Sequence, residues 1–362
     1  MAERLNTDSA VFRADSGDPA PLPRGAGHAE VLDQVLQALR EYRVMAVGHR
    51  VVHGGEAFSD SVVLDAASIR RIEACSELAP LHNPANLLGI AAARARFPDV
   101  PHVGVFDTAF HQTLPPKAYL YAIPYELYLR HHVRRYGFHG LSHSYVAREA
   151  ALRLGKPVAE LQLVTAHLGN GCSACAVRGG RSVDTTMGLT PLEGLVMGTR
   201  SGDVDPNLHE FLVEHAGLSL TEVTDLLNRK SGLLGLSGSS NDMRTLLDAR
   251  ERKDERASLA IDVFCYRLAK AVLGLAAALE RVDALVFTGG IGEHAAAIRA
   301  ETLGALRVLG PVLDPKLNSM HGQTSNGRIT TAGSRLLSLV VPTNEELVIA
   351  RETARLASGA GR

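Results

Sequence analysis

Short apolar runs that end in glycine or asparagine recur along this chain. In the clearest one, an apolar run at 161–164 continues into His167-Leu168-Gly169-Asn170-Gly171. An apolar run that ends in this way predicts a buried strand followed by a tight loop. Two further strands are predicted over 173–177 and 182–186, with Gly179-Gly180 as the hairpin turn between them.

The same patterns predict strands and helices in both halves of the chain. Strands are predicted over 44–52, 103–106, 284–287 and 336–341, and helices over 28–40, 66–78, 83–93 and 257–279. A last helix is predicted to follow Glu346 and to run to Leu356. Asn83 before Pro84 reads as a helix cap, and Ser142 is predicted to cap a helix that runs to Leu154. Ser219 and Glu222 form a capping box, which predicts another helix start.

Length and composition allow two domains and argue against several classes of function. The chain has 362 residues, of which 46% are apolar and 21% charged. A net charge of −1 argues against a nucleic-acid or anionic-membrane partner. Without an apolar run of membrane-spanning length or an N-terminal signal core, a cytoplasmic protein is expected. Four cysteines fit a reducing compartment, and Cys172 and Cys175 are predicted to be small buried residues.

Several polar residues occupy positions that favour binding or catalysis. Glycines beside Asn170 let backbone N–H groups approach a phosphate, and Arg200 between glycines suits capture of a carboxylate or phosphoryl group. Surface turns are the alternative for both loops. Arg50 interrupts an apolar strand, where a charge is costly unless it is paired or functional, and a salt bridge at the rim is the alternative. Asp107 follows a predicted strand, as α/β cleft residues do, although it could simply cap a turn.

Three further candidates also have structural alternatives. His139 lies between a large apolar residue and glycine, and it could be a core histidine instead of a ligand. Glu345 follows the last predicted strand, where it suits a metal or simply the first turn of a helix. Residues 231–244 are rich in glycine and serine and read as a flexible linker or a binding loop.

Taken together, these motifs resemble the acetate kinase family. The resemblance rests on HLGNG at 167–171, TTMGLTPLEGL at 185–195, GTRSGDVDP at 198–206, GHRVVHGG at 48–55, APLHNPAN at 79–86, VFDTAFHQTLP at 105–115, YGFHGLSH at 136–143, FTGGIGEH at 287–294 and PTNEELVIARE at 342–352. The motifs stand in the family's order and cover the chain from about residue 28 onward.

The resemblance implies an α/β protein with a duplicated, two-domain actin-like fold, in which mixed sheets are flanked by helices and the active-site cleft lies between the domains. It implies an acceptor-side domain of 28–145 with about 345–362, and a nucleotide-binding domain of 146–344. Residues 1–27 read as a loose tail, and the family's opening strand-loop-strand is expected to be lacking.

The resemblance also implies the reaction of acetate with ATP to give acetyl phosphate and ADP, with Mg²⁺ or alternatively Mn²⁺, in a homodimer. The implied catalytic residues are Arg50, Asp107, His139 and Arg200. The implied apolar pocket for the methyl group is Val52, Leu81, Phe138 and Pro191. The implied nucleotide-binding residues are His167, Gly169, Asn170, Gly171, Asp242, Arg244, Gly289, Gly290, Ile291 and Gly292, and Glu345 is implied at the metal.

Two other functions stay open at this point. One is a kinase of propionate or butyrate, because an apolar pocket discriminates a methylene by only about 1–3 kcal/mol. The other is a member of the family that binds nucleotide but is catalytically impaired, since the opening phosphate loop is not found.

Overall fold

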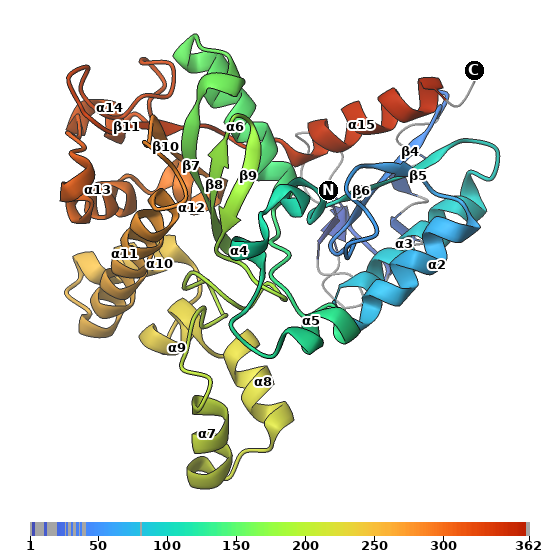
Figure 1. The fold of residues 1–362 in the computed structure, drawn as a ribbon, viewed down its shortest axis with the longest axis horizontal. Helices are drawn as coiled ribbons and strands as arrows, with labels where there is room; N and C mark the ends of the chain where they lie inside the picture. Colours follow the sequence, from blue (N-terminus) through green and yellow to red (C-terminus); the bar gives the residue numbers. More distant parts are fainter. Residues whose placement is uncertain are drawn as a thin grey trace. The chain divides into compact units, whose positions relative to one another are not determined.

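The chain forms two compact units. The computed structural model describes residues 2–3, 11–12, 20–25, 27, 30–31, 34–35, 37, 41–79 and 82–359. Unit 1 comprises Met1–Ala109 with Glu346–Arg362, and unit 2 comprises Phe110–Glu345 (Figure 1). The two units thus divide the chain after residue 109. The boundary predicted at residue 145, between an acceptor-side and a nucleotide-binding domain, stays a prediction.

A three-stranded sheet forms the centre of unit 1. Strand β4 (Val47–Val51) pairs in parallel with β6 (His102–Phe106), and β5 (Val62–Val63) pairs with β6 in antiparallel, so the order is β4-β6-β5. Every residue of β6 is buried, as expected for the middle strand. Both strands predicted in this part of the chain are therefore confirmed.

Helices cover both faces of this sheet. They are α2 (Ala66–Ala74), followed by the 3-10 turn η1 (Cys75–Glu77), α3 (Asn83–Arg96) and α15 (Glu345–Gly359), whose residues from Glu346 belong to unit 1. Val51 of β4 packs in one core cluster with Ile72 and Ile90 of α2 and α3. Gly48 points to the opposite face, where an added Cβ would lie 2.6 Å from Ile349 Cγ2 of α15.

The N-terminal residues differ from the expected loose tail. Three two-residue strands, β1 (Ala2–Glu3), β2 (Val11–Phe12) and β3 (Ala20–Pro21), pair in antiparallel in that order. Most other residues of 1–27, and most of the helix predicted over 28–40, lie outside the described residues.

Unit 2 is built on a five-stranded mixed sheet. Its strands are β7 (Gln162–Leu168), β8 (Cys172–Arg178), β9 (Arg181–Thr185), β10 (Ala284–Thr288) and β11 (Leu337–Val340). The order is β11-β10-β7-β8-β9, in which β10 is parallel to β7 and β11 while β8 and β9 run antiparallel. The predicted hairpin at Gly179-Gly180 is confirmed, since both glycines adopt positive φ between β8 and β9.

Helices also bury both faces of the second sheet. Helix α6 (Gly140–Leu154) packs on β7, β8, β10 and β11 in one core cluster, and α11 (Glu255–Ala276) contacts β7 and β8 (Figure 1). Consecutive residues of β7, β8 and β10 are buried, as covered faces require. Cys172 and Cys175 are buried free thiols in β8, as predicted.

Shorter elements complete unit 2. They are η2 (Ala109–Thr113, which begins at the last residue of unit 1), α4 (Pro116–Tyr119), α5 (Tyr125–His131), η3 (Val158–Glu160), α7 (Leu208–Ala216), α8 (Leu220–Arg229), α9 (Gly232–Ser237), α10 (Met243–Glu251), α12 (Gly289–His294), α13 (Ala296–Ala305), η4 (Arg307–Leu309) and α14 (Pro315–Ser319). The capping box of Ser219 and Glu222 opens α8 as predicted. The segment 231–244 is not a simple linker, because it contains α9 and the start of α10.

Two predicted helix caps are wrong. Asn83 is the first residue of α3, and its side chain binds the backbone of His53 instead. Ser142 lies inside the first turn of α6, where its hydroxyl contacts His167. In both cases the side chain does not cap its own helix. It contacts a neighbouring loop or strand instead.

Three segments leave the sheet of unit 2 at the same end of its parallel strands. Strands β7, β10 and β11 are parallel, so the segments 169–171, 289–292 and 342–345 all follow carboxyl ends of strands. In open α/β sheets this end is where ligands bind. Within the part of the chain that the structure describes, no helix is long and apolar enough to cross a membrane.

Candidate active site

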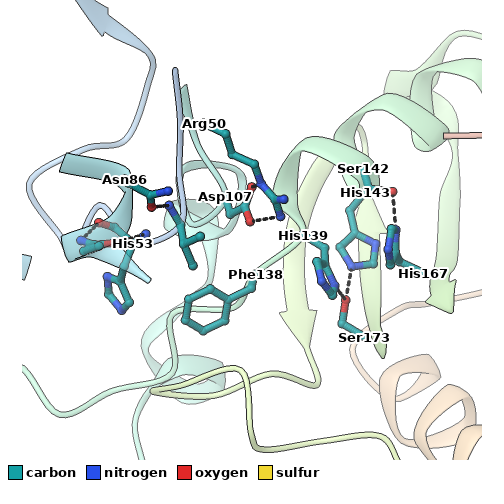
Figure 2. Close-up of polar contacts among 12 residues, drawn as sticks. Arg50, His53, Asn86, Asp107, Phe138, His139, Ser142, His143, His167 and Ser173 are labelled. Atoms are coloured by element: carbon teal, nitrogen blue, oxygen red, sulfur yellow. Dashed lines mark hydrogen bonds and ion pairs between the residues drawn. The ribbon is translucent and has the colours of Figure 1, made fainter. Parts of the chain in front are cut away.

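In unit 1, Asp107 holds the guanidinium of Arg50. Arg50 Nε donates to Asp107 Oδ1 at 3.0 Å and Nη2 donates to Oδ2 at 2.6 Å (Figure 2). The Asp107 side chain is 2% exposed, whereas that of Arg50 is 44% exposed. The two residues come from adjacent parallel strands, because Arg50 lies in β4 and Asp107 directly follows β6. A buried carboxylate therefore orients a cation that solvent and small anions can reach.

Two asparagines of α3 fix the chain after β4. Asn86 Oδ1 accepts from the backbone N–H of Val52 at 3.1 Å, and Asn83 binds both the N–H and the carbonyl of His53 at 3.1 and 2.9 Å (Figure 2). Val52 is half-buried here, while Leu81, its predicted companion, lies outside the described residues. The asparagines were missed as site residues, although their spacing of three on a helix start could have indicated one shared face.

In unit 2, His139 adopts an unusual backbone conformation beside a second histidine. Its φ is +56° at the residue before α6, a region that non-glycine residues rarely occupy. Its ring stacks on His167 with centroids 4.4 Å apart, and His167 Nδ1 lies 2.8 Å from Ser142 Oγ. Ser173 Oγ lies 2.9 Å from His139 Nδ1 and 2.8 Å from Nε2 of the buried His143 (Figure 2).

His139 and Arg200 face the same glycine. A Cβ on Gly171 would lie 3.4 Å from His139 Nε2 and 3.7 Å from Arg200 Nη1. Arg200 donates to the carbonyl of Pro191 at 3.3 Å, and burial lowers the pKa of its guanidinium. The structure therefore brings two predicted catalytic residues together where the backbone of the predicted phosphate loop carries no side chain.

The loop that carries Pro191 and Arg200 is held by a network that sequence reasoning missed. Glu193 accepts from the Tyr121 hydroxyl and pairs with Arg135, and Tyr121 Oη accepts from the N–H of Leu189 at 2.8 Å. Burial raises the pKa of Tyr121, which keeps the hydroxyl a donor. Nearby, Phe138 is 1% exposed, so this predicted pocket residue is part of the protein interior.

A cavity of about 570 Å³ lies beside the predicted phosphate loop. Six of the predicted nucleotide-binding residues line it, namely Gly169, Asn170, Asp242, Arg244, Gly290 and Ile291. Five further lining residues were not predicted: Asn241, Met243, Leu247, His294 and Ala295. The volume falls within the usual range for small-molecule pockets. The apolar side chains of Met243 and Leu247 and the polar side chain of Asn241 suit a ligand with a flat, partly polar ring.

Asp242 and Arg244 bind each other at the rim of this cavity. Arg244 Nη2 lies 2.6 Å from Asp242 Oδ2, and this hydrogen bond lowers the pKa of Asp242 to about 2. Asp242 Oδ1 also accepts from the Arg244 N–H at 2.8 Å and so caps α10. The Arg244 side chain is 88% exposed, and its role at the nucleotide stays a prediction.

The other predicted nucleotide residues do not line the cavity. His167, Gly171, Gly289 and Gly292 lie in the neighbouring segments, and their roles stay predictions. Gly289 has φ +75°, and an added Cβ would lie 2.8 Å from the carbonyl oxygen of Leu168. This close approach explains why glycine stands where β10 enters α12.

A buried arginine holds α12 in place. Arg299 is fully buried, and its Nη1 donates to the carbonyls of Gly292 and Glu293, each at 2.9 Å. Its other nitrogens contact Asn318 Oδ1, the Asn318 carbonyl and His321 Nδ1 at 2.8, 2.8 and 3.0 Å. Burial lowers the pKa of Arg299 to about 10. Sequence reasoning missed it because a single arginine in a helix gives no sign of burial.

Glu345 is the residue predicted to bind the metal ion. It begins α15 after β11 and is half-buried. Among the described residues, no group of three or more His, Cys, Asp or Glu side chains could hold a metal ion. Mg²⁺ commonly keeps several waters and binds through one carboxylate and substrate phosphates, so a single glutamate fits this ion.

Solved structures define the class of protein. The chain matches a propionate kinase from Francisella tularensis with a TM-score of 0.92 and 46% identity, over 98% of this chain and 92% of that one. It matches an acetate kinase from Porphyromonas gingivalis with a TM-score of 0.89 and 42% identity, again over 98% and 92%. The predicted actin-like α/β fold with mixed sheets flanked by helices is thereby confirmed.

The sequence comparisons give the family. The acetokinase family model matches residues 4–351, which begins earlier than the motifs that were predicted to start near residue 28. The acetate kinase of Deinococcus deserti is 58% identical over 98% of this chain and 90% of its own length. That of Deinococcus radiodurans is 54% identical over 100% of this chain and 92% of its own length. The chain belongs to the acetokinase family.

Proposed function

We propose that this chain transfers a phosphoryl group from ATP to acetate, giving ADP and acetyl phosphate by direct in-line transfer. The observation that carries the proposal is the convergence of His139 and Arg200 on Gly171, in a loop next to the nucleotide-sized cavity. Phosphoryl transfer needs positioning and positive charge around the transferring group more than covalent chemistry.

The nucleotide base and ribose are assigned to the cavity lined by Asn241, Asp242, Arg244 and Ile291. The phosphates are then assigned to the loop 169–171, where glycines let backbone N–H groups approach closely. Arg200 stabilises charge that develops on the equatorial oxygens, and His139 donates a hydrogen bond to the same group.

The acceptor is assigned to Arg50. Its guanidinium is oriented by Asp107 and partly exposed, as binding of a small carboxylate requires. Acetate is already ionised at pH 7, so no strong general base is needed. The half-buried Val52, two residues after Arg50, is proposed to contact the methyl group.

Mg²⁺ is proposed as the metal, with Mn²⁺ as an alternative. When bound, the ion would neutralise charge on the phosphates during transfer. Glu345 would hold it together with phosphate oxygens and water.

A homodimer in the cytoplasm is proposed as the working state. Leu259 and Tyr266 on α11 are 54% and 61% exposed, which provides apolar surface for a second copy. The four buried free thiols suit a reducing compartment. Light scattering during gel filtration tests the dimer, and a monomeric mass would contradict it.

Turnover with ATP and a panel of acids tests the activity. We expect acetate to give the highest kcat/KM and propionate to be weaker by roughly 10- to 200-fold, the usual value of one methylene. Propionate or butyrate above acetate would assign the chain to a different acid. Binding of ADP without any turnover would make it a silent nucleotide-binding member of the family.

Replacement of Arg200 by alanine tests the mechanism. We expect kcat to fall by about 10³–10⁵, because an arginine at the transferring group has that effect in related chemistry. The circular dichroism spectrum and melting temperature should stay near those of the parent. The exposed Arg178→Ala at the end of β8 is the matched control. Parent-like turnover in Arg200→Ala would remove Arg200 from the site.

A further inference from the structure

Two hydroxyls and two histidines alternate in a continuous hydrogen-bonded chain inside unit 2. Thr165 Oγ1 lies 2.7 Å from His143 Nδ1, and His143 Nε2 lies 2.8 Å from Ser173 Oγ. Ser173 Oγ in turn lies 2.9 Å from His139 Nδ1 (Figure 2). Thr165 comes from β7, Ser173 from β8 and His143 from α6, so the chain crosses from the core of the sheet to the residue that faces Gly171.

The inner histidine is neutral. His143 is fully buried, and burial holds its pKa well below the ordinary value of 6.5. A neutral imidazole has one N–H donor and one nitrogen acceptor. Each hydroxyl likewise has one proton. Ser173 is fully buried, and among the described residues its Oγ contacts only the rings of His143 and His139, so its proton must go to one of them. The protons along the chain therefore all point in the same direction.

Only two directions are consistent with these contacts. In the outward direction, Thr165 donates to His143 Nδ1, His143 Nε2 donates to Ser173, and Ser173 donates to His139 Nδ1. In the inward direction each donor becomes an acceptor, and the Thr165 proton must turn to the carbonyl of Cys175, 3.4 Å away. A donor-acceptor distance of 3.4 Å makes a weak hydrogen bond, whereas 2.7 Å is close to the best for a hydroxyl. The outward direction thus leaves each proton in a short contact.

We infer that Thr165, His143 and Ser173 fix His139 as the neutral tautomer that carries its proton on Nε2. In the outward direction His139 Nδ1 must accept a hydrogen bond, so it cannot carry a proton, and a charged imidazolium is excluded for the same reason. The Nε2 proton then lies on the edge of the ring that faces Gly171 and Arg200.

This arrangement gives the site a neutral donor beside a cation. A neutral imidazole donates to a developing negative oxygen without placing a second positive charge next to Arg200. Thr165, His143 and Ser173 are positioning residues in this scheme, since they act only through His139. The catalytic consequence of this tautomer depends on the proposed kinase function, but the tautomer itself does not.

Nitrogen-15 NMR of the whole chain with labelled histidine tests the tautomer directly. We expect the ring signals of His139 and His143 both to show a proton on Nε2 and a bare Nδ1, and His139→Gln and His143→Gln assign the signals by their loss. A proton on Nδ1 of His139 would overturn the inference. This measurement needs no turnover, so it stands even if the chain proves inactive with acetate.

Kinetics of Ser173→Ala tests the positioning role. We expect kcat to fall by roughly 10- to 100-fold with little change in KM, as for lost orientation of a catalytic group, and Ser173→Thr to restore much of it by keeping a hydroxyl. Ser182→Ala is the matched control, because Ser182 is also fully buried and lies 2.7 Å from a ring nitrogen of the buried His111. An equal loss of kcat in both alanine variants would contradict a specific role for Ser173.

Discussion

At the scale of single residues, the pair of Arg50 and Asp107 shows how a buried group prepares an exposed one. Asp107 is almost completely buried and accepts two hydrogen bonds from one guanidinium. A bidentate pair fixes the plane of the guanidinium as well as its position. The outer edge of Arg50 is therefore oriented before any ligand arrives.

Replacement of Asp107 by asparagine should loosen this orientation. An amide nitrogen cannot accept from Arg50, so one of the two hydrogen bonds is lost. We expect KM for acetate to rise by roughly tenfold, the effect of about 1.4 kcal/mol, with KM for ATP nearly unchanged. Steady-state kinetics measures both. Asp225→Asn, in an exposed ion pair on α8, should change neither, and an unaltered acetate KM in Asp107→Asn would contradict the assignment.

At the scale of elements, the contacts of two single residues position helices in the two units. Arg299 holds the end of α12 by its carbonyls, and Gly48 allows α15 to approach β4. In each case one residue decides how closely two elements pack. Substitutions at these positions should therefore act through the element and not through the chemistry.

Arg299→Lys should separate nucleotide binding from catalysis. An ammonium group cannot reproduce the five N–H donors of the guanidinium, so carbonyls of Gly292 and Glu293 lose partners. We expect the free energy of unfolding to fall by roughly 1–3 kcal/mol and the Kd for ADP to rise by about tenfold. Denaturant unfolding and calorimetry measure these two quantities. The exposed Arg307→Lys is the control, and parent-like ADP binding in Arg299→Lys would refute a role in holding α12.

Gly48→Ala should destabilise unit 1. The new methyl would lie against Thr353 and 2.6 Å from Ile349 Cγ2, and β-branched side chains on a helix have little freedom to move. We expect a loss of about 1–3 kcal/mol in the free energy of unfolding. Gly89→Ala in α3 is the opposite case, because nothing lies within 4 Å of its added Cβ. That variant should gain about 0.5–1 kcal/mol, and equal effects of the two would contradict the packing argument.

At the scale of the whole molecule, the buried His111 and His143 and the half-buried His49 should make the protein sensitive to acid. Burial lowers the pKa of His49 and of His111 to about 4, and it lowers that of His143 well below 6.5. Between the folded and unfolded pKa values the unfolded chain binds more protons. The contribution of these histidines to the free energy of unfolding is therefore fully present above pH 6.5 and is lost as the pH falls toward 4.

The expected loss is up to about 1.4 kcal/mol per pH unit for each of these histidines. Denaturant unfolding at pH 7.5 and 5.5 measures it. His49→Gln removes one titrating group and should reduce the difference between the two pH values, whereas the exposed His131→Gln should not. A difference that stays the same in His49→Gln would show that other groups carry the acid sensitivity.

The central strands and the glycine loops could be predicted from sequence because their signals are local. The apolar run before Gly169 and the hairpin at Gly179-Gly180 both lie where the pattern puts them. Asn83 and Ser142 were wrongly read as helix caps because a local pattern cannot show that a partner 30 or 25 residues away competes for the side chain. Arg299 was missed for the same reason.

The candidate site was predicted in part. Motifs indicated Arg50, His139, Arg200 and the loop at 169–171, and six of the predicted nucleotide residues line one cavity. The residues that orient them, such as Ser173 and Asn86, have ordinary neighbours in the sequence. The spacing of Asn83 and Asn86 could have indicated a shared helix face, but the contacts that give these residues their function arise only when separate strands and helices meet.

The four cysteines give this chain built-in reporters of its own opening. All are buried, and burial raises the pKa of Cys172, Cys175 and Cys265 to about 12 and also raises that of Cys75. A thiol reagent should therefore react only when the polypeptide around each sulfur opens. Cys75 lies in one unit and the other three lie in the second. The rate at which each cysteine is alkylated, followed by mass spectrometry, thus measures local opening in unit 1 and in unit 2 separately. No added probe is needed.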